Sequence, residues 1–138
     1  MSAKPFLDTN IVLYLLSGDA TKANQAEALL AQGGTISVQV LSEAVNVMTK
    51  KLTMDLDEVC DVLAGVRYAC DVQPVTIETH DQALDIMCRY GFSIYDSGII
   101  AAAAGAGCTT LYSEDLQDGQ RIGPDLTITN PFKQDSAN

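Results

Sequence analysis

The chain has 138 residues, which is enough for one domain with a hydrophobic core and too few for two ordinary domains. Hydrophobic residues make up 47% of the chain, a share typical of globular proteins, and 18 acidic against 8 basic residues give a net charge of −10. This charge argues against sequence-independent attraction of nucleic acid to the whole surface. A phosphate substrate would therefore need local basic groups or bound cations.

The cysteines and the apolar segments exclude several further classes of protein. Cys60, Cys70, Cys88 and Cys108 form no C-x-x-C pair that would indicate a zinc or redox site, so we expect buried thiols in a reducing compartment. The first residues lack the long apolar segment of a secretion signal, and the apolar run at 99–104 is much shorter than a bilayer-spanning helix. We therefore expect a soluble, cytoplasmic protein without a membrane partner.

The first part of the chain predicts strands separated by helices. Residues 3–7 form the first expected strand, and a short helix is expected to begin at the polar residues 8–10 and to run through residue 16. An Ala-rich helix follows over 21–32, where two glycines stop it, and residues 35–38 form the second strand. Over 39–52 the apolar residues recur at helical spacing.

The middle of the chain continues this alternation. Residues 55–68 predict an amphipathic helix with acidic residues in its first turns, and residues 72–75 predict a brief strand. Thr79 is the expected N-cap of the next helix, which ends at Gly91. The single histidine, His80, falls at the start of this helix, where we expect it on the surface.

Asp96 begins a segment so apolar, residues 95–104, that the helix it forms must be buried. Taken alone, Asp96 is best interpreted as the N-cap of this helix, because Asp is a preferred capping residue. A strand at 109–112, a polar loop at 113–119 and a last short strand at 126–129 follow.

The alternation of short strands and helices predicts an α/β sandwich around a mainly parallel sheet, as a single domain over 1–132 with a C-terminal tail at 133–138. Ligands of such sheets bind beyond the carboxyl ends of the strands. Asp8 and Asp115 follow two predicted strands, and Asp96 heads the helix that leads into the second of these. The three carboxylates are therefore expected at one rim of the sheet.

Carboxylates held close together repel one another, so they recruit a cation or at least one of them has a raised pKa. Oxygen ligands favour Mg²⁺ or Mn²⁺, which can polarise a phosphoryl oxygen and generate hydroxide at neutral pH. The chain has no phosphate-binding glycine motif of the nucleotide-binding folds and no supported arrangement of Ser or Cys with His. Metal-dependent phosphodiester hydrolysis is the chemistry that this cluster indicates.

A further acidic residue lies in a polar stripe of the helix at 39–52. Gln39, Glu43, Asn46 and Lys50 are spaced by four, three and four residues, which places them on one face. From the residues alone, a solvent-facing stripe is favoured over a pocket lining. Lys50 and Lys51 could meet a phosphate near Glu43 or could be a solvated helix end, and the residues leave both open.

Four motifs in order resemble the PIN domain family, and in particular its VapC-like toxins. They are Asp8-Thr9-Asn10 after a short strand, Glu43 in Val-Leu-Ser-Glu-Ala-Val-Asn, Ile-Tyr-Asp96-Ser before an Ala-rich helix, and Leu-Tyr-Ser113-Glu-Asp115-Leu. The resemblance implies a three-layer α/β/α sandwich with strand order 3-2-1-4-5 and a Mg²⁺- or Mn²⁺-dependent endoribonuclease acting on RNA. It also implies a homodimer and a cognate antitoxin whose C-terminal segment covers the active site.

Carried over residue by residue, the resemblance implies four metal-site acids and two supporting polar residues. The acids are Asp8, Glu43, Asp96 and Asp115, and the supporting residues are Asn10 and Ser113. It also changes the interpretation of the stripe near Glu43 from an outer face to a pocket lining. Whether Glu114 or Asp118, beside the fourth acid, shares its role is left open.

Two other functions remain as alternatives. A Mg²⁺-dependent phosphatase of the haloacid-dehalogenase type also uses an Asp after its first strand, but it expects a second Asp where this chain has Asn10. A metal-free module whose acidic rim binds a basic protein is the second alternative.

Overall fold

A computed structural model describes residues 4–133 of the chain. The sheet contains six strands, which are β1 (Phe6–Leu7), β2 (Gly34–Ser37), β3 (Cys70–Gln73), β4 (Thr110–Tyr112), β5 (Arg121–Ile122) and β6 (Leu126–Thr129). The helices are α1 (Thr9–Leu13), the short 3-10 helix η1 (Tyr14–Leu16), α2 (Ala20–Ala31), α3 (Val38–Lys50), α4 (Leu56–Ala69), α5 (Ile77–Tyr90) and α6 (Ile94–Gly105). None of the helices in this part of the chain is both long and apolar enough to cross a membrane.

The strands lie in the order β3-β2-β1-β4-β6-β5, and all neighbours are parallel except β5 and β6. The predicted order 3-2-1-4-5 corresponds to β3-β2-β1-β4-β6, because the last predicted strand is β6. The prediction is confirmed, with one addition. The sequence prediction lacks β5, a two-residue edge strand that pairs with the start of β6.

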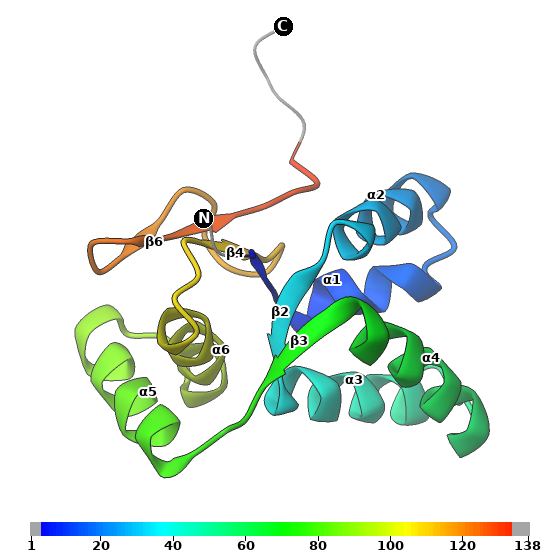
Figure 1. The fold of residues 1–138 in the computed structure, drawn as a ribbon, viewed down its shortest axis with the longest axis horizontal. Coiled ribbons are helices and arrows are strands. Elements are labelled where there is room, and N and C mark those ends of the chain that lie inside the picture. Colours follow the sequence, from blue (N-terminus) through cyan, green and yellow to red (C-terminus); the bar gives the residue numbers. More distant parts are fainter. Residues whose placement is uncertain (1–3, 134–138) are drawn as a thin grey trace, which may run out of the picture.

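The helices cover both faces of the sheet, which confirms the three-layer α/β/α arrangement. Figure 1 shows α5 and α6 together on one side of the β2 and β3 arrows, and α1, α2, α3 and α4 on the other. Parallel strands buried on both faces need apolar side chains throughout. Phe6, Leu7, Ile36, Leu111 and Ile128 meet this need, since all five are fully buried.

Helix α6 is the most deeply buried helix, as its apolar sequence predicts. Its residues Ile99, Ile100, Ala101 and Ala103 are almost inaccessible to solvent, and α6 contacts β2 and β4 as well as α5. Small alanine side chains let this helix lie close to the sheet. The first turn of α6 is thereby fixed next to the carboxyl ends of the central strands.

The structure corrects two predicted helix caps. The N-cap of α6 is Ser93, whose side chain accepts a 3.1 Å hydrogen bond from the backbone N–H of Asp96, so Asp96 is not the cap. The N-cap of α5 is Thr76, which forms a reciprocal capping box with Thr79. In both cases two capping-type residues stand three positions apart, and the sequence alone does not say which of the two is the cap.

Other predictions have mixed outcomes. Cys70 and Cys108 are buried, but Cys60 and Cys88 are exposed, so the expectation of four buried thiols is wrong for two of them. His80 is exposed as expected. Residues 134–138 of the predicted tail lie outside the described residues, and the single domain over 1–132 stays a prediction.

Candidate active site

The site is built at the carboxyl ends of β1 and β4, which are parallel neighbours. Leu7 lies opposite Tyr112 in the register, so Asp8 and Ser113 leave the sheet side by side. Asp8 is 7% exposed and caps α1, with Oδ1 accepting a 2.7 Å hydrogen bond from the Thr9 N–H. The hydroxyl of Ser113 donates to Oδ2 of Asp8 at 2.8 Å. Both carboxylate oxygens of Asp8 are therefore held by donors.

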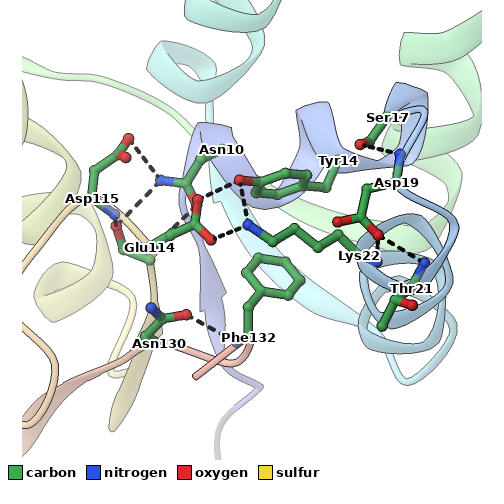
Figure 2. Close-up of polar contacts among 11 residues, drawn as sticks. Asn10, Tyr14, Ser17, Asp19, Thr21, Lys22, Glu114, Asp115, Asn130 and Phe132 are labelled. Carbon is green, nitrogen blue, oxygen red and sulfur yellow. Dashed lines mark hydrogen bonds and ion pairs between the residues drawn. The ribbon is translucent and has the colours of Figure 1, made fainter. Parts of the chain in front are cut away.

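Asn10 connects Asp8 to the fourth acid. Its Nδ2 donates to Oδ2 of Asp115 at 3.1 Å, to Ser113 Oγ at 3.3 Å and, with a long 3.4 Å contact, to Oδ2 of Asp8. Its Oδ1 accepts from the backbone N–H of Glu114 at 3.1 Å. Figure 2 shows Asn10 lying between Asp115 and Glu114. Asn10 thus holds the loop after β4 against α1.

Glu43 reaches the same rim from α3, which starts directly after β2. Its Oε1 accepts a 2.6 Å hydrogen bond from the hydroxyl of Thr9, and its Oε2 accepts a 3.1 Å bond from Nε2 of Gln39. The same Gln39 nitrogen donates to the backbone oxygen of Tyr95 at 2.8 Å. Glu43 is therefore tied to α1 on one side and, through Gln39, to the start of α6 on the other. Gln39, Glu43 and Asn46 line a groove together with residues of α1 and the loop after β4, so the polar stripe is a pocket lining there.

Asp96 lies in the first turn of α6 and is half-buried. Burial is the main cause that raises the pKa of its carboxyl above the ordinary value, and the negative charges of Glu43 and Asp115 raise it further. In Asp8, burial raises the pKa to about 6 although the bonds from Ser113 and Thr9 oppose the shift. Glu43 and Asp115 add to that shift as well. Glu43 and Asp115 are thus close enough to both Asp8 and Asp96 to raise the pKa of these two carboxyls.

The donor atoms of this cluster suit a hard divalent cation, since carboxylate, amide and hydroxyl oxygens are the ligands that Mg²⁺ and Mn²⁺ prefer. Within residues 4–133, however, no group of three or more His, Cys, Asp and Glu side chains is arranged to hold a metal ion. Hydrogen bonds to neighbouring side chains engage Asp8, Glu43 and Asp115. The residue types therefore fit such an ion, and a carboxylate oxygen that accepts one hydrogen bond keeps a second lone pair for a cation.

Glu114 points away from the acids and forms a separate cluster, which we call the Glu114 clamp: Tyr14, Lys22 and Glu114. Lys22 Nζ lies 2.8 Å from Oε2 of Glu114 and donates to the Tyr14 hydroxyl at 3.1 Å, and this hydroxyl donates to the other oxygen of Glu114. Figure 2 shows the Lys22 side chain passing between the rings of Tyr14 and Phe132 toward Glu114. Donation from Lys22 and Tyr14 lowers the pKa of the Glu114 carboxyl.

The clamp and the partners of Asp118 bear on the open question about the fourth acid. Asp118 accepts from the Asn130 N–H at 2.8 Å and pairs with Lys133 at 3.3 Å. Both Glu114 and Asp118 are therefore occupied by partners outside the acidic rim, and Asp115 is the loop acid that contacts Asn10.

Sequence reasoning missed three residues of the site neighbourhood. Thr9 stands between two recognised motif residues, so its position was a usable signal. Tyr14 and Lys22 offered none, because Tyr14 belongs to an apolar run and Lys22 to an ordinary helix surface, 92 residues before its partner Glu114.

The sequence model of the PIN domain matches residues 6–118, a range that contains all four acids as well as Asn10 and Ser113. The chain belongs to the PIN domain family. Members of this family are nucleases. No match was found among curated protein sequences.

Solved structures share this PIN fold at low sequence identity. DNA-bound VapBC from Salmonella typhimurium has a TM-score of 0.70 and 21% identity, over 94% of this chain and 98% of that one. A toxin–antitoxin complex from Klebsiella pneumoniae has a TM-score of 0.69 and 20% identity, over 94% and 99%. VapC20 of Mycobacterium tuberculosis, described as a sarcin-ricin loop cleaving toxin, has a TM-score of 0.65 and 21% identity, over 80% and 88%. At these identities the likeness establishes the fold.

Proposed function

We propose that this PIN domain is a metal-dependent endoribonuclease and the toxin of a toxin–antitoxin pair. The observation that carries the proposal is the meeting of four carboxylates from four separate parts of the chain at one rim, where burial, together with the charges of Glu43 and Asp115, raises the pKa of Asp8 and Asp96. Members of the PIN family are nucleases. The solved structures of similar fold include a toxin that cleaves the sarcin-ricin loop and two toxin–antitoxin assemblies.

In the proposed enzyme, Asp8, Glu43, Asp96 and Asp115 hold Mg²⁺ or Mn²⁺. When bound there, such an ion would polarise a phosphoryl oxygen of the substrate and make a water molecule a better nucleophile at neutral pH.

The polar neighbours set the positions of these acids. Ser113 and the Thr9 N–H orient Asp8, and Asn10 orients Asp115. The Thr9 hydroxyl and Gln39 fix Glu43 between α1 and α6. Such neighbours matter in metal sites, because their removal typically costs about 10- to 100-fold in metal affinity or activity.

The test of cleavage compares purified protein with Mg²⁺, with Mn²⁺ and with EDTA on small structured RNAs. Asp96→Asn is expected to abolish cleavage, and Asp57→Asn to leave it unchanged. Asp57 is the matched control because it also lies in the first turn of a helix, α4, but is exposed outside the groove. Calorimetric titration with Mn²⁺ gives a second readout, in which Asp96→Asn loses affinity. Cleavage that persists in EDTA, or that survives Asp96→Asn, would overturn the proposal.

The proposed partners are a cognate antitoxin and a second copy of the chain. A net charge of −10 suits an antitoxin with a basic C-terminal segment, and two of the solved structures of this fold are toxin–antitoxin assemblies. Co-expression with the product of an adjacent small reading frame should give a complex without RNA cleavage. Sedimentation of the purified chain measures whether it is a dimer.

The two alternatives have less support. The PIN match and the amide of Asn10, which bonds Asp115, disfavour a haloacid-dehalogenase-type phosphatase. A metal-free binding module for a basic protein would bind a basic peptide in calorimetry without binding Mg²⁺ or Mn²⁺.

A further inference from the structure

A separate cavity lies at the end of the sheet opposite the acidic rim. It has a volume of about 310 Å³ and is enclosed by the second half of α5, the end of α6 and the turn between β5 and β6. Thr109, directly before β4, and Leu126, the first residue of β6, belong to its wall, so we call it the amino-end pocket. Because the acidic rim lies at the carboxyl ends of β1 and β4, the length of the strands separates the two sites.

The floor of the amino-end pocket is apolar. Ile86 of α5, Cys108, Ile122 of β5 and Leu126 of β6 line it, and all four are buried. Burial raises the pKa of the Cys108 thiol, which keeps this side chain uncharged at neutral pH. Gly107 leaves room above the floor, since a Cβ there would meet no atom within 4 Å. An apolar group that enters this space is removed from water, which favours its binding.

Hydrogen bonds hold the walls of the pocket in place. The N–H of Gly123, in the turn between β5 and β6, donates to the Tyr90 hydroxyl at the end of α5 at 2.9 Å. Across the same turn, Nη2 of Arg121 donates to the backbone oxygen of Pro124 at 2.6 Å. These bonds fix the turn against α5. The pocket is therefore preformed, as small-molecule sites usually are.

The mouth of the pocket carries a negative charge. Asp85 and Arg89 both line it and pair with each other at 3.3 Å, so their charges offset one another. Asp125 also lines the mouth and is exposed, and within residues 4–133 its carboxylate takes part in no ion pair. Arg121, on the same turn, donates to Pro124 instead. In a chain of net charge −10, this mouth attracts a cation and repels an anion.

We propose that the amino-end pocket binds a small organic amine, with its apolar part on the floor and its ammonium group at Asp125. The volume has room for about ten heavy atoms, if each takes the ~30 Å³ of one water molecule in the liquid. Because a solvent-exposed charge pair contributes little, the apolar floor supplies most of the affinity and Asp125 supplies the selectivity. This inference does not depend on the proposed ribonuclease function, since none of the four acids of the rim lines this pocket.

The test titrates three probes of similar size into the isotope-labelled protein and follows the chemical shifts of the backbone amides. The probes are phenethylamine, its neutral counterpart phenethyl alcohol and the anion phenylacetate. Phenethylamine should shift the amides of Gly107, Gly123 and Leu126. It should bind about two- to fivefold more tightly than the alcohol, which is the range of a solvent-exposed charge pair. Phenylacetate should bind more weakly than either.

Variants of the mouth and the wall test the two parts of the site. Asp125→Asn should remove the preference for the amine and leave binding of the alcohol unchanged. The matched control is Asp81→Asn, because Asp81 is exposed on α5 and does not line the pocket. Ala104→Leu places a larger side chain in the wall and should abolish binding of all three probes. Melting temperatures check the fold, and Asp125→Asn, at an exposed position, keeps the test valid if Ala104→Leu does not fold.

Mg²⁺ distinguishes this pocket from the acidic rim, whose charge also attracts an amine. With saturating Mg²⁺, phenethylamine should still shift the amides of the amino-end pocket. Shifts confined to the amides of Asp8 and Asp115, or none at the pocket with any probe, would overturn the inference. Equal binding of the amine and the alcohol, or tighter binding of phenylacetate, would also overturn it. If the pocket binds the amine but the protein cleaves no RNA, this inference stands and the proposed function fails.

Discussion

The hydroxyl of Ser113 donates a 2.8 Å hydrogen bond to Oδ2 of Asp8, joining two buried side chains that are 105 residues apart in the chain. Oγ of Ser113 also accepts hydrogen bonds from Nδ2 of Asn10 and from the backbone N–H groups of Asp115 and Leu116. One serine thus holds the first acid, the supporting amide and the loop of the fourth acid. The stability of the rim and its chemistry depend on the same hydroxyl.

Ser113→Ala should destabilise the protein by about 1–3 kcal/mol, because Oδ2 of the buried Asp8 loses its short hydrogen bond and keeps only the long contact to Asn10. Urea unfolding measures this loss. The control is Ser97→Ala, since Ser97 is equally buried but its hydroxyl has no hydrogen-bond partner among residues 4–133. That change should leave stability unchanged or slightly raised. Equal losses in the two variants would contradict the role assigned to Ser113.

The stability of the metal-free protein should fall as pH rises through the ionisation of Asp8. Burial raises the folded pKa of Asp8 from 3.8 to about 6, so the folded chain binds the proton more tightly than the unfolded chain. The contribution of protonated Asp8 is present at about pH 4 and is lost by about pH 6, a change of roughly 3 kcal/mol. Asp8→Asn should therefore raise the free energy of unfolding at pH 7.5 in EDTA.

The control for this prediction is Asp19→Asn. Asp19 also caps a helix, α2, with its side chain, but it is exposed outside the acidic rim. Asn is as good a cap as Asp, so the two variants share the capping change and differ in the removal of a buried charge. If Asp19→Asn raised the free energy of unfolding at pH 7.5 as much as Asp8→Asn does, this would count against the electrostatic explanation.

Strong local patterns predicted most of the fold, and tertiary contacts account for what was missed. The apolar strands and the helical spacing of the chain predict β1 to β4, β6 and the main helices. Strand β5 has only two residues, Arg121–Ile122, and exists through its pairing with β6, so no periodicity could indicate it. Caps at Thr76 and Ser93 were missed because Thr79 and Asp96 are also capping residues.

The site was predictable to the extent that its residues stand next to strand and helix ends. Asp8, Asp96 and Asp115 could be placed at one rim from the alternation of elements. Glu43 required the family resemblance, because its stripe taken alone resembles a solvent-facing helix side. The clamp between Lys22 and Glu114 joins two distant segments, and no local pattern carries information about such a pairing.

Gly98→Ala should reduce activity without reducing stability. A Cβ at Gly98 would lie 2.5 Å from Oε1 of Gln39, so this flexible side chain must move away from Glu43 and Tyr95. Alanine itself favours the helix by up to about 1 kcal/mol over glycine. We expect a near-neutral free energy of unfolding and a loss of RNA cleavage of about 10- to 100-fold, as for the loss of a residue that orients a metal ligand.

Gly65→Ala is the control for Gly98→Ala. Gly65 lies within α4 and a Cβ there meets no atom within 4 Å. It should add about 0.5–1 kcal/mol of stability and leave cleavage unchanged. Gln39→Ala should reproduce the activity loss of Gly98→Ala. Full activity in both Gly98→Ala and Gln39→Ala would show that Gln39 does not position Glu43.

The Glu114 clamp should couple Lys22 and Glu114 energetically and should support the loop that carries Asp115. Lys22 and Glu114 are both partly buried and share the Tyr14 hydroxyl, and the Glu114 N–H donates to Asn10. A double-mutant cycle with Lys22→Met and Glu114→Gln should give a favourable coupling energy. Each single variant should also lower RNA cleavage, because the loop loses a fixed point next to Asp115.

The pH dependence of stability and a control ion pair test whether the Glu114 clamp stabilises the fold. The lowered pKa of Glu114 means that the clamp contributes fully above the unfolded value of about 4.5 and is lost as pH falls through the lower folded value. The control cycle uses Lys4→Met and Asp71→Asn, an ion pair of 3.3 Å whose side chains are 51% and 64% exposed. Solvent screens such a pair, so its coupling should be near zero. A coupling as large as that of Lys22 and Glu114 would mean that the clamp is an ordinary surface ion pair.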